Sequence, residues 1–161
     1  MKKLFILLVS MTFASYVQAA GGSGANQIYL GGGVSSNDAL GDTATGFQLF
    51  AGMPMPVKMG KARLLGEAGY MDSGDFDYNV PFWGNVGKYS VKGFWANAVV
   101  EMPVAASLNL IGRAGLDFGD DDGLMIGAGV GIPVSSKFDI RFEYVIRDHV
   151  DSLQANLVIK L

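Results

Sequence analysis

The sequence contains no cysteine, a single histidine, and no long uninterrupted hydrophobic run after its first residues. The absence of cysteine excludes disulfide bonds and thiolate metal sites. The net charge is −3 and the basic residues form no stripe, so nucleic acid is not an expected partner. A helix that crosses a bilayer needs roughly 20 apolar residues. The longest candidate, residues 124–134, is shorter and is broken by glycines and Pro133, so we expect no membrane helix in the mature chain.

The first residues have the pattern of a secretory signal peptide. Two lysines precede a short, mainly apolar run, and small residues stand where a signal peptidase would cut, after Ala19. The apolar run is too short for a membrane anchor. We therefore predict a signal peptide over residues 1–19 and a single mature domain over residues 20–161.

Half of the residues are hydrophobic, and in the mature chain they alternate with other residues rather than running together. Strict alternation indicates β-strands, because successive side chains of a strand leave opposite faces. The clearest pair is residues 138–146 and 152–161, which a short polar turn separates, so we predict a hairpin there. Because the last strand reaches the final residue, its edge needs a partner. The first strand of the mature domain is the expected partner, and their pairing would close a barrel.

The same alternation predicts eight strands in the mature domain. They cover residues 27–34, 46–53, 62–71, 91–102, 108–118, 124–132, 138–146 and 152–161. The connections after the odd-numbered strands are polar and acidic, and the longest of them covers residues 72–90. The connections after the even-numbered strands are short or contain proline, which cannot donate to a strand ladder. This asymmetry is typical of bacterial outer-membrane barrels, whose periplasmic turns are short and whose extracellular loops are longer.

The two faces of the predicted strands differ in composition. One consists almost entirely of apolar residues, whereas the other is rich in glycine and carries a few charges. The charged positions on the second face are Arg63, Glu67, Glu101, Arg113, Arg141, Glu143 and Lys160. A soluble lipocalin-like barrel has a polar exterior, and the apolar face would exceed the patches that soluble monomers expose. An arginine that faces lipid at mid-membrane costs roughly 2–4 kcal/mol. We therefore predict an all-β, eight-stranded antiparallel up-and-down transmembrane β-barrel with its charges in a lumenal network.

Two short motifs resemble those of a known family. Residues 67–70 (Glu-Ala-Gly-Tyr) and 141–144 (Arg-Phe-Glu-Tyr) resemble the E-x-G-Y and R-x-E-Y strand motifs of OmpA-type and OmpX-like small eight-stranded outer-membrane barrels. The resemblance implies a location in the bacterial outer membrane and a lumenal ion pair between Glu67 and Arg141. It also implies contact with outer-membrane lipid and lipopolysaccharide, and recognition of the C-terminal strand by the outer-membrane assembly machinery.

The chain departs from the family pattern at three positions. Val99 and Gly131 stand where the family has a second lumenal pair of lysine and glutamate, so that pair is lost. Leu161 ends the sequence where such barrels usually end in phenylalanine.

Few residues suggest catalysis or metal binding. His149 and Ser152 could serve as base and nucleophile of a lipid-modifying enzyme, but a turn histidine without a positioned partner is ordinarily solvated. The acidic run at residues 120–122 could bind Ca²⁺ or bridge to lipopolysaccharide phosphates. Its spacing matches no calcium loop, and a solvated acidic turn is the simpler interpretation. We predict no catalytic residue, no cofactor and no metal ion.

The loop predicted over residues 72–90 carries an unusual group of aromatic residues. They are Phe76, Tyr78, Phe82 and Trp83. Three interpretations stay open: contact with an extracellular partner, since aromatic residues anchor interfaces; insertion into the outer membrane interface; and packing on one another over the barrel mouth. We expect this loop to be exposed at the cell surface and dispensable for barrel stability, because loop tips tolerate change.

Three functions are compatible with these features. The first is a structural or surface-interaction role in the bacterial envelope, which a narrow lumen filled with side chains favours. The second is a small pore. The third is a lipid-modifying outer-membrane enzyme.

Overall fold

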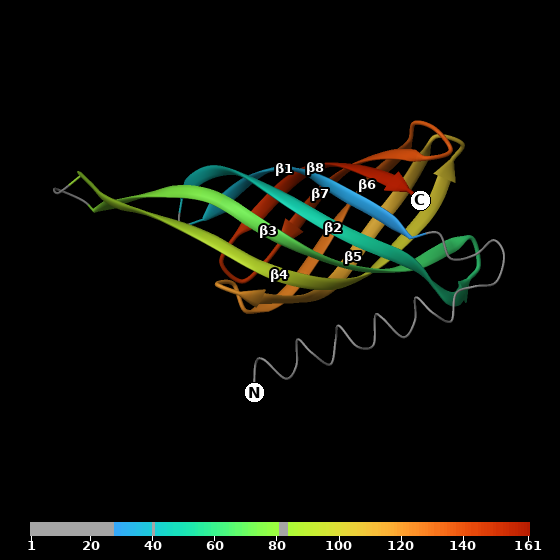
Figure 1. The fold of residues 1–161 in the computed structure, drawn as a ribbon, viewed down its shortest axis with the longest axis horizontal. Coiled ribbons are helices and arrows are strands. Elements are labelled where there is room, and N and C mark those ends of the chain that lie inside the picture. Colours follow the sequence, from blue (N-terminus) through green and yellow to red (C-terminus); the bar gives the residue numbers. More distant parts are fainter. Residues whose placement is uncertain (1–27, 40, 81–83) are drawn as a thin grey trace.

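The computed structural model describes residues 28–39, 41–80 and 84–161, which form a closed barrel of β-strands (Figure 1). The strands are β1 (Tyr29–Ala39), β2 (Asp42–Met59), β3 (Ala62–Val80), β4 (Gly84–Ala105), β5 (Leu108–Gly119), β6 (Gly123–Pro133), β7 (Phe138–Ile146) and β8 (Asp151–Lys160). Within this described part, no helix is long and apolar enough to cross a membrane. The predicted eight-stranded antiparallel fold is confirmed, while the predicted signal peptide lies outside the described residues.

The barrel closes between its first and last strands, as the alternation of the C-terminal strand predicts. β1 pairs antiparallel with β8, with Leu30 opposite Ile159 and Val34 opposite Ala155. Beyond the last pair, the backbone N–H of Leu161 donates to the carbonyl oxygen of Ile28 at 3.0 Å. The backbone groups at this seam are therefore paired, and the sheet has no open edge there.

Several strands are longer than the sequence predicts. The predicted loop over residues 35–45 is mostly strand, because β1 continues to Ala39 and β2 begins at Asp42. β2 also continues past Pro54 and Pro56 to Met59, whereas the sequence predicts its end at residue 53. The reason is a bulge between Pro54 and Lys58, where the pairing register of β2 and β3 shifts. A residue that cannot donate to the ladder is tolerated at such a bulge.

The largest correction concerns residues 72–90, which form a hairpin rather than a loop. β3 runs to Val80 and β4 starts at Gly84, so the two strands stay paired far beyond the barrel wall (Figure 1). At its base, the register shifts between Asp72 and Asp75, and Gly74 has a φ of 78°. This left-handed conformation favours glycine, and the side chain of Asp72 accepts a hydrogen bond from the Gly74 N–H at 3.0 Å.

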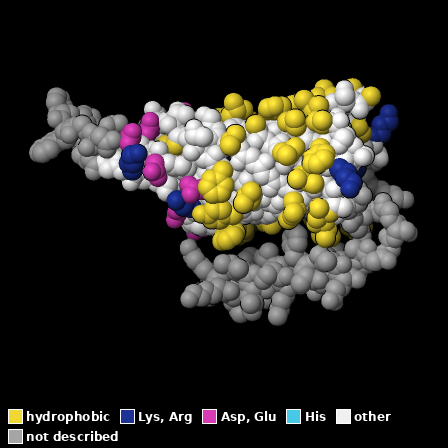
Figure 2. Space-filling model, turned by 45° about the horizontal axis from the view of Figure 1, so that its top comes forward, with side chains coloured by type: hydrophobic (Ala, Val, Ile, Leu, Met, Phe, Trp, Pro, Cys, Tyr) yellow, Lys and Arg dark blue, Asp and Glu magenta, His cyan; other side chains and the backbone are white. Residues whose placement is uncertain are grey.

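The outer surface of the barrel carries the predicted apolar face. Exposed hydrophobic side chains spread over the barrel body, and acidic side chains gather toward the hairpin (Figure 2). Three outward aromatic rings from β2, β3 and β4 touch one another: Phe47 and Tyr70 at 6.5 Å between centroids, and Tyr70 and Phe94 at 5.3 Å. Aromatic girdles of this kind flank the lipid-facing band of outer-membrane barrels. The apolar exterior is what a transmembrane barrel requires.

Candidate functional site

The centre of the lumen holds a cluster of four charged side chains. Glu67 on β3 accepts from the guanidinium of Arg141 on β7 at 2.5 Å and from the hydroxyl of Tyr29 on β1 at 2.7 Å. Its second oxygen lies 3.4 Å from Arg113 on β5. Arg113 in turn lies 2.5 Å from Glu143 on β7. These contacts define the central cluster, Glu67, Arg113, Arg141 and Glu143.

The central cluster is buried and formally neutral. All four of its residues are almost completely inaccessible to solvent. Two arginines balance two glutamates, which is the arrangement that a crowded interior tolerates, since a buried charge without a partner is costly. The sequence predicted these residues on the inward face, and the structure brings them together.

Aromatic rings line the central cluster on two sides. The guanidinium of Arg113 lies 5.6 Å from the ring centroid of Trp95, and that of Arg141 lies 5.3 Å from the ring of Tyr29. Both distances fit cation–π contacts. The ring of Phe50 lies 5.8 Å from that of Trp95.

Inward glycines make room for these rings. A Cβ atom at Gly31 would collide with the ring of Phe50, and one at Gly52 would collide with the ring of Tyr29. A Cβ atom at Gly69 would approach the indole of Trp95 to 2.7 Å. The glycine-rich inner face therefore allows large side chains to fill the lumen.

The lumen is closed at this level. The largest fully buried side chains come from strands all around the barrel. They include Gln48 on β2, Glu67 on β3, Trp95 and Val99 on β4, Met125 on β6, and Glu143 and Val145 on β7. Because these inward side chains are fully buried, they fill the lumen and leave no open channel at their level in the described part of the barrel.

The other residues predicted for one network lie apart from the central cluster. Arg63 pairs with Glu101 at 2.8 Å near the end of the barrel that holds the C-terminus, and its side chain is 54% exposed. Lys160 pairs with Asp139 at 2.7 Å at the same end. The seven predicted residues thus fall into three groups, because inward parity does not fix height along the barrel.

A further lumenal group near the hairpin end was not predicted. The guanidinium of Arg147 lies 3.3 Å from Asp117 and donates to the hydroxyl of Ser152 at 2.9 Å. Ser152 donates in turn to Asn37 at 2.7 Å. Sequence reasoning assigned Arg147 to the turn, although it continues the odd-numbered inward positions of β7. This odd-numbered position could have identified Arg147 as a lumenal residue.

Phe76 closes the mouth of the barrel. Its side chain is fully buried and stacks on Tyr89 with 5.0 Å between ring centroids. Both rings pack with Ala39, Ala44, Val91 and Val150. Of the three interpretations for the aromatic group, the structure supports packing over the mouth for Phe76. The side chain of Tyr78, and Phe82 and Trp83 altogether, lie outside the described residues.

His149 and Ser152 do not form a catalytic pair. The Nδ1 atom of His149 lies 2.8 Å from a carboxylate oxygen of Asp121, and its backbone N–H donates to the other oxygen at 3.3 Å. Ser152 is buried and engaged with Arg147 and Asn37.

The three aspartates at residues 120–122 face different partners. Asp120 accepts from the Lys92 N–H, Asp121 contacts His149, and Asp122 accepts from the Gly119 N–H. Among the described residues, no group of three or more acidic or histidine side chains could hold a metal ion.

The contact between His149 and Asp121 predicts a pH dependence. The hydrogen bond to Asp121 and its negative charge raise the pKa of His149 above its ordinary value of 6.5. A raised pKa in the folded state means that the protonated imidazole stabilises the fold below about pH 6.5, and that this contribution is lost as pH rises through the folded pKa. Since His149 is the only histidine, its ring resonance can be followed by NMR without assignment.

We expect Asp121→Asn to move the pKa of His149 back toward 6.5, and to remove the difference in stability between low and high pH that His149 causes. Asp148→Asn is the matched control, because Asp148 is a weaker influence on the same imidazole. An unchanged titration in Asp121→Asn would show that the contact does not persist in solution.

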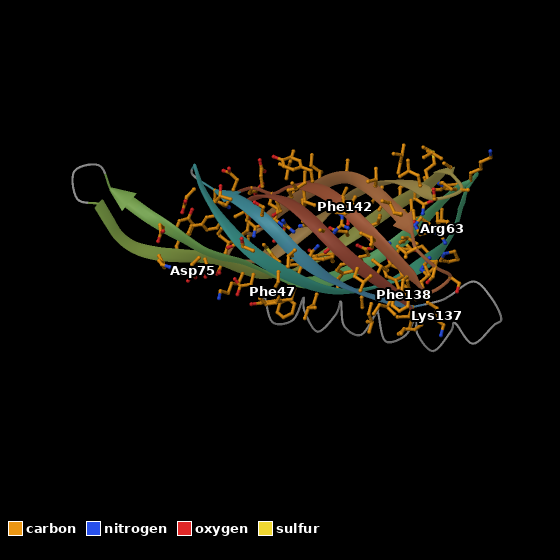
Figure 3. The ribbon with its side chains drawn as sticks, turned by 90° about the horizontal axis from the view of Figure 1, so that it is seen from above. Phe47, Arg63, Asp75, Lys137, Phe138 and Phe142 are labelled. Carbon is orange, nitrogen blue, oxygen red and sulfur yellow. The ribbon has the colours of Figure 1, made fainter. Side chains whose placement is uncertain are left out.

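Charge is distributed unequally between the two ends of the barrel. Eleven of the twelve aspartates lie in the turns and strand segments of the hairpin end. The exception is Asp139, near the C-terminal end. Five basic residues lie at that end: Lys58, Lys61, Arg63, Lys137 and Lys160. Figure 3 shows Asp75 at one end, with Arg63 and Lys137 toward the other. The barrel is therefore acidic at its hairpin end and basic at its C-terminal end.

Comparison with known proteins agrees with the geometry. The model of the outer membrane protein beta-barrel domain matches residues 5–157. A de novo designed transmembrane β-barrel is similar with a TM-score of 0.57 and 14% identity, over 86% of this chain and 98% of the other. Ail of Yersinia pestis in a phospholipid bilayer nanodisc gives a TM-score of 0.55 and 14% identity, over 84% and 99% of the two chains.

A crystal structure of Ail in complex with the heparin analogue sucrose octasulfate gives a TM-score of 0.50 at 16% identity, over 84% of this chain and 95% of that one. At these identities the likeness concerns the fold. No curated protein sequence matches the chain. Because the family model spans nearly its whole length, the chain belongs to the outer membrane protein beta-barrel domain family and is an integral protein of the bacterial outer membrane.

Proposed function

We propose that this protein acts from the cell surface as an interaction protein and does not conduct solutes. The observation that carries the proposal is a closed lumen below a hairpin that rises beyond every neighbouring strand (Figure 1). In bacterial barrels the short turns face the periplasm and the longer connections face outward. The β3–β4 hairpin then projects into the medium, where a partner can reach it.

In the described residues, the projecting part of the hairpin forms no ladder with another strand, although Phe76 at its base packs on Ala39 and Ala44. β3 last pairs with β2 at Asp72, and β4 first pairs with β5 at Gly93. Between these positions the two strands pair with each other, as in Phe76 opposite Tyr89. The edge of an exposed strand can accept an extended segment of another chain, with main-chain hydrogen bonds providing affinity.

The acidic outer end selects the charge of the partner. Ail, which shares the fold, is described in complex with a sulfated heparin analogue. The outer end of this chain carries eleven aspartates, so a polyanion would be repelled and a cationic surface attracted. We therefore propose a cationic partner surface, and contact with lipopolysaccharide phosphates only through counter-ions. The C-terminal strand would remain the segment that the assembly machinery reads.

A hairpin deletion tests the proposal at constant charge. Removing residues 77–88 and joining Phe76 to Tyr89 through Asn-Gly, which suits a two-residue hairpin turn, removes one aspartate and one lysine. The aromatic stack over the barrel mouth is kept. The purified protein in zwitterionic nanodiscs would be passed over surfaces that carry immobilised oligolysine or heparin.

We expect the wild-type protein to bind oligolysine and not heparin, and the deletion to weaken binding several-fold while heat-modifiable migration on a gel is retained. Equal binding by the deletion variant would remove the hairpin from the proposal. Retention on heparin as strong as on oligolysine would contradict the selection by charge.

A small pore is the alternative function, and one observation favours it. Buried polar atoms in the lumen, among them Trp95 Nε1 and both amide atoms of Asn97, have no hydrogen-bond partner within the described part of the chain. Because these atoms are buried, water can satisfy them only after neighbouring side chains move apart, and linked waters would then begin a conducting path. A steady conductance of the wild-type protein in planar bilayers would establish this alternative in place of the closed barrel.

A further inference from the structure

An apolar groove lies on the outside of the barrel at its C-terminal end, which the orientation proposed above places at the periplasm. It forms where β2 leaves its ladder, since the three residues between Pro54 and Lys58 stand opposite the single residue Leu64. The groove has a volume of about 350 Å³, at the small end of the range for ligand sites. Its lining includes Met55, Val57, Met59, Ala62 and Arg63.

The groove exposes large apolar side chains beside basic ones. Met55, Val57 and Met59 are 41%, 49% and 45% exposed, and they point away from the lumen at the last turn of the barrel wall. The next residues are Lys61, which is exposed, and Arg63, which is half exposed. The structure thus places an apolar floor beside two cationic residues: Arg63 lines the groove, and Lys61 lies in the adjoining connection between β2 and β3.

The two cationic side chains have donors to offer. Arg63 uses one terminal nitrogen to bind Glu101 at 2.8 Å, which leaves the other guanidinium donors for a ligand. Lys61 forms no ion pair in the described part of the chain, and its ammonium carries three donors. A ligand that suits both features has an anionic head and an apolar tail.

We propose that this groove binds one anionic phospholipid of the periplasmic leaflet, with its phosphate on Lys61 and Arg63 and part of an acyl chain against Met55, Val57 and Met59. The position at the periplasmic rim fits a headgroup, and the positive charge of this end fits its sign. The opposite end of the barrel is acidic and offers no such complement. Basic side chains near the bilayer surface favour anionic lipids over neutral ones.

Native mass spectrometry of the purified barrel tests the proposal. The protein would be released from micelles that contain equal amounts of phosphatidylglycerol and phosphatidylethanolamine, after heat-modifiable migration has shown that each variant is folded. We expect the wild-type protein to retain one phosphatidylglycerol with roughly tenfold preference, because two cationic side chains act on the headgroup.

Three variants separate a site from a diffuse charge effect. The double variant Lys61→Gln with Arg63→Gln should abolish the preference, so that phosphatidylglycerol and phosphatidylethanolamine are retained about equally. Ala62→Phe, which fills the groove without changing charge, should lower retention of either lipid. Lys137→Gln is the matched control, since it removes an exposed lysine from another turn at the same end, and it should keep the tenfold preference.

Equal retention of both lipids by the wild-type protein would overturn the proposal and indicate a neutral occupant. An unchanged preference in the double variant would also overturn it. An equal loss of preference in Lys137→Gln would replace the site with a property of the whole basic rim.

Discussion

Replacing Arg141 with alanine is expected to destabilise the folded barrel by up to about 3–5 kcal/mol, the usual cost of removing one partner from a buried ion pair. The guanidinium of Arg141 contacts Glu67 at 2.5 Å, and both side chains are buried. Its loss leaves Glu67 with Arg113 at 3.4 Å as its remaining cation. Arg113 is shared with Glu143 at 2.5 Å, so one arginine then serves two carboxylates. Any water that enters the lumen will reduce the loss.

Arg63→Ala is the matched control for this substitution. Arg63 also pairs with a buried glutamate, Glu101 at 2.8 Å, but the Arg63 side chain is 54% exposed, and Glu101 keeps a hydrogen bond from the Asn109 amide at 2.6 Å without it. An ion pair that water screens on one side contributes less than a fully buried one. Urea titration of both variants in lipid vesicles should therefore show a large loss for Arg141→Ala and a small one for Arg63→Ala.

The same pair is expected to keep the lumen closed. Without the Arg141 side chain, the space over the ring of Tyr29 is no longer filled, and we expect a larger conductance or more frequent open states in planar bilayers. The double variant Glu67→Gln with Arg141→Gln should recover part of the stability, because no unpaired charge remains, but not the block. If Arg141→Ala unfolds like the wild-type protein and conducts no differently, the pair has no role in stability or closure.

The fold could be predicted from the sequence because one face of each membrane strand meets lipid and the other meets the lumen. Apolar and polar residues therefore alternate along the strand. Phe142 faces lipid and its neighbours Arg141 and Glu143 face the lumen, as their alternation predicts. The same pattern predicts the pairing of β1 with β8, since a membrane barrel cannot leave an edge unpaired in lipid. The contact with lipid is therefore what makes the strands recognisable in the sequence.

The hairpin could not be predicted in the same way. Residues 75–80 and 84–90 extend beyond the ladders with β2 and β5, so the outer part of the ribbon has no lipid-facing side that must be apolar, and its aspartates and glycines resemble loop residues. What keeps them in strands is cross-strand pairing, such as Asp77 opposite Lys88 and Phe76 opposite Tyr89. Such pairs contribute only about 0.2–1 kcal/mol each, and the sequence alone does not show which residues are opposite.

The position of each charge along the barrel axis also could not be predicted from the sequence. Parity places Arg63, Lys160 and Glu67 on the inner face, but only the register between strands sets their level. Lys160 lies opposite Tyr29 at the end of β1 and reaches Asp139 rather than Glu67. Register depends on how all eight strands close, and it has no local signal.

Trp95→Ala is expected to have a second large effect, because Trp95 is the largest fully buried side chain of the lumen. It fills the space between Phe50 at 5.8 Å and the guanidinium of Arg113 at 5.6 Å. Removing a buried tryptophan side chain typically costs about 3–5 kcal/mol, partly through the cavity that it leaves. We expect a loss of this order in urea titrations.

The adjacent residue supplies the control, and the two side chains differ mainly in the face they occupy. Phe94 precedes Trp95 on β4, points outward and is 63% exposed. Phe94→Ala removes apolar surface from the lipid side and should leave conductance at the wild-type level, whereas Trp95→Ala opens a void beside Arg113. Polar atoms line that void, so water should fill it, and conductance in planar bilayers should rise. Trp95→Phe should restore most of the block, because it refills the space beside Phe50. If the Trp95→Ala variant conducts no more than the wild-type protein, the central cluster alone closes the lumen.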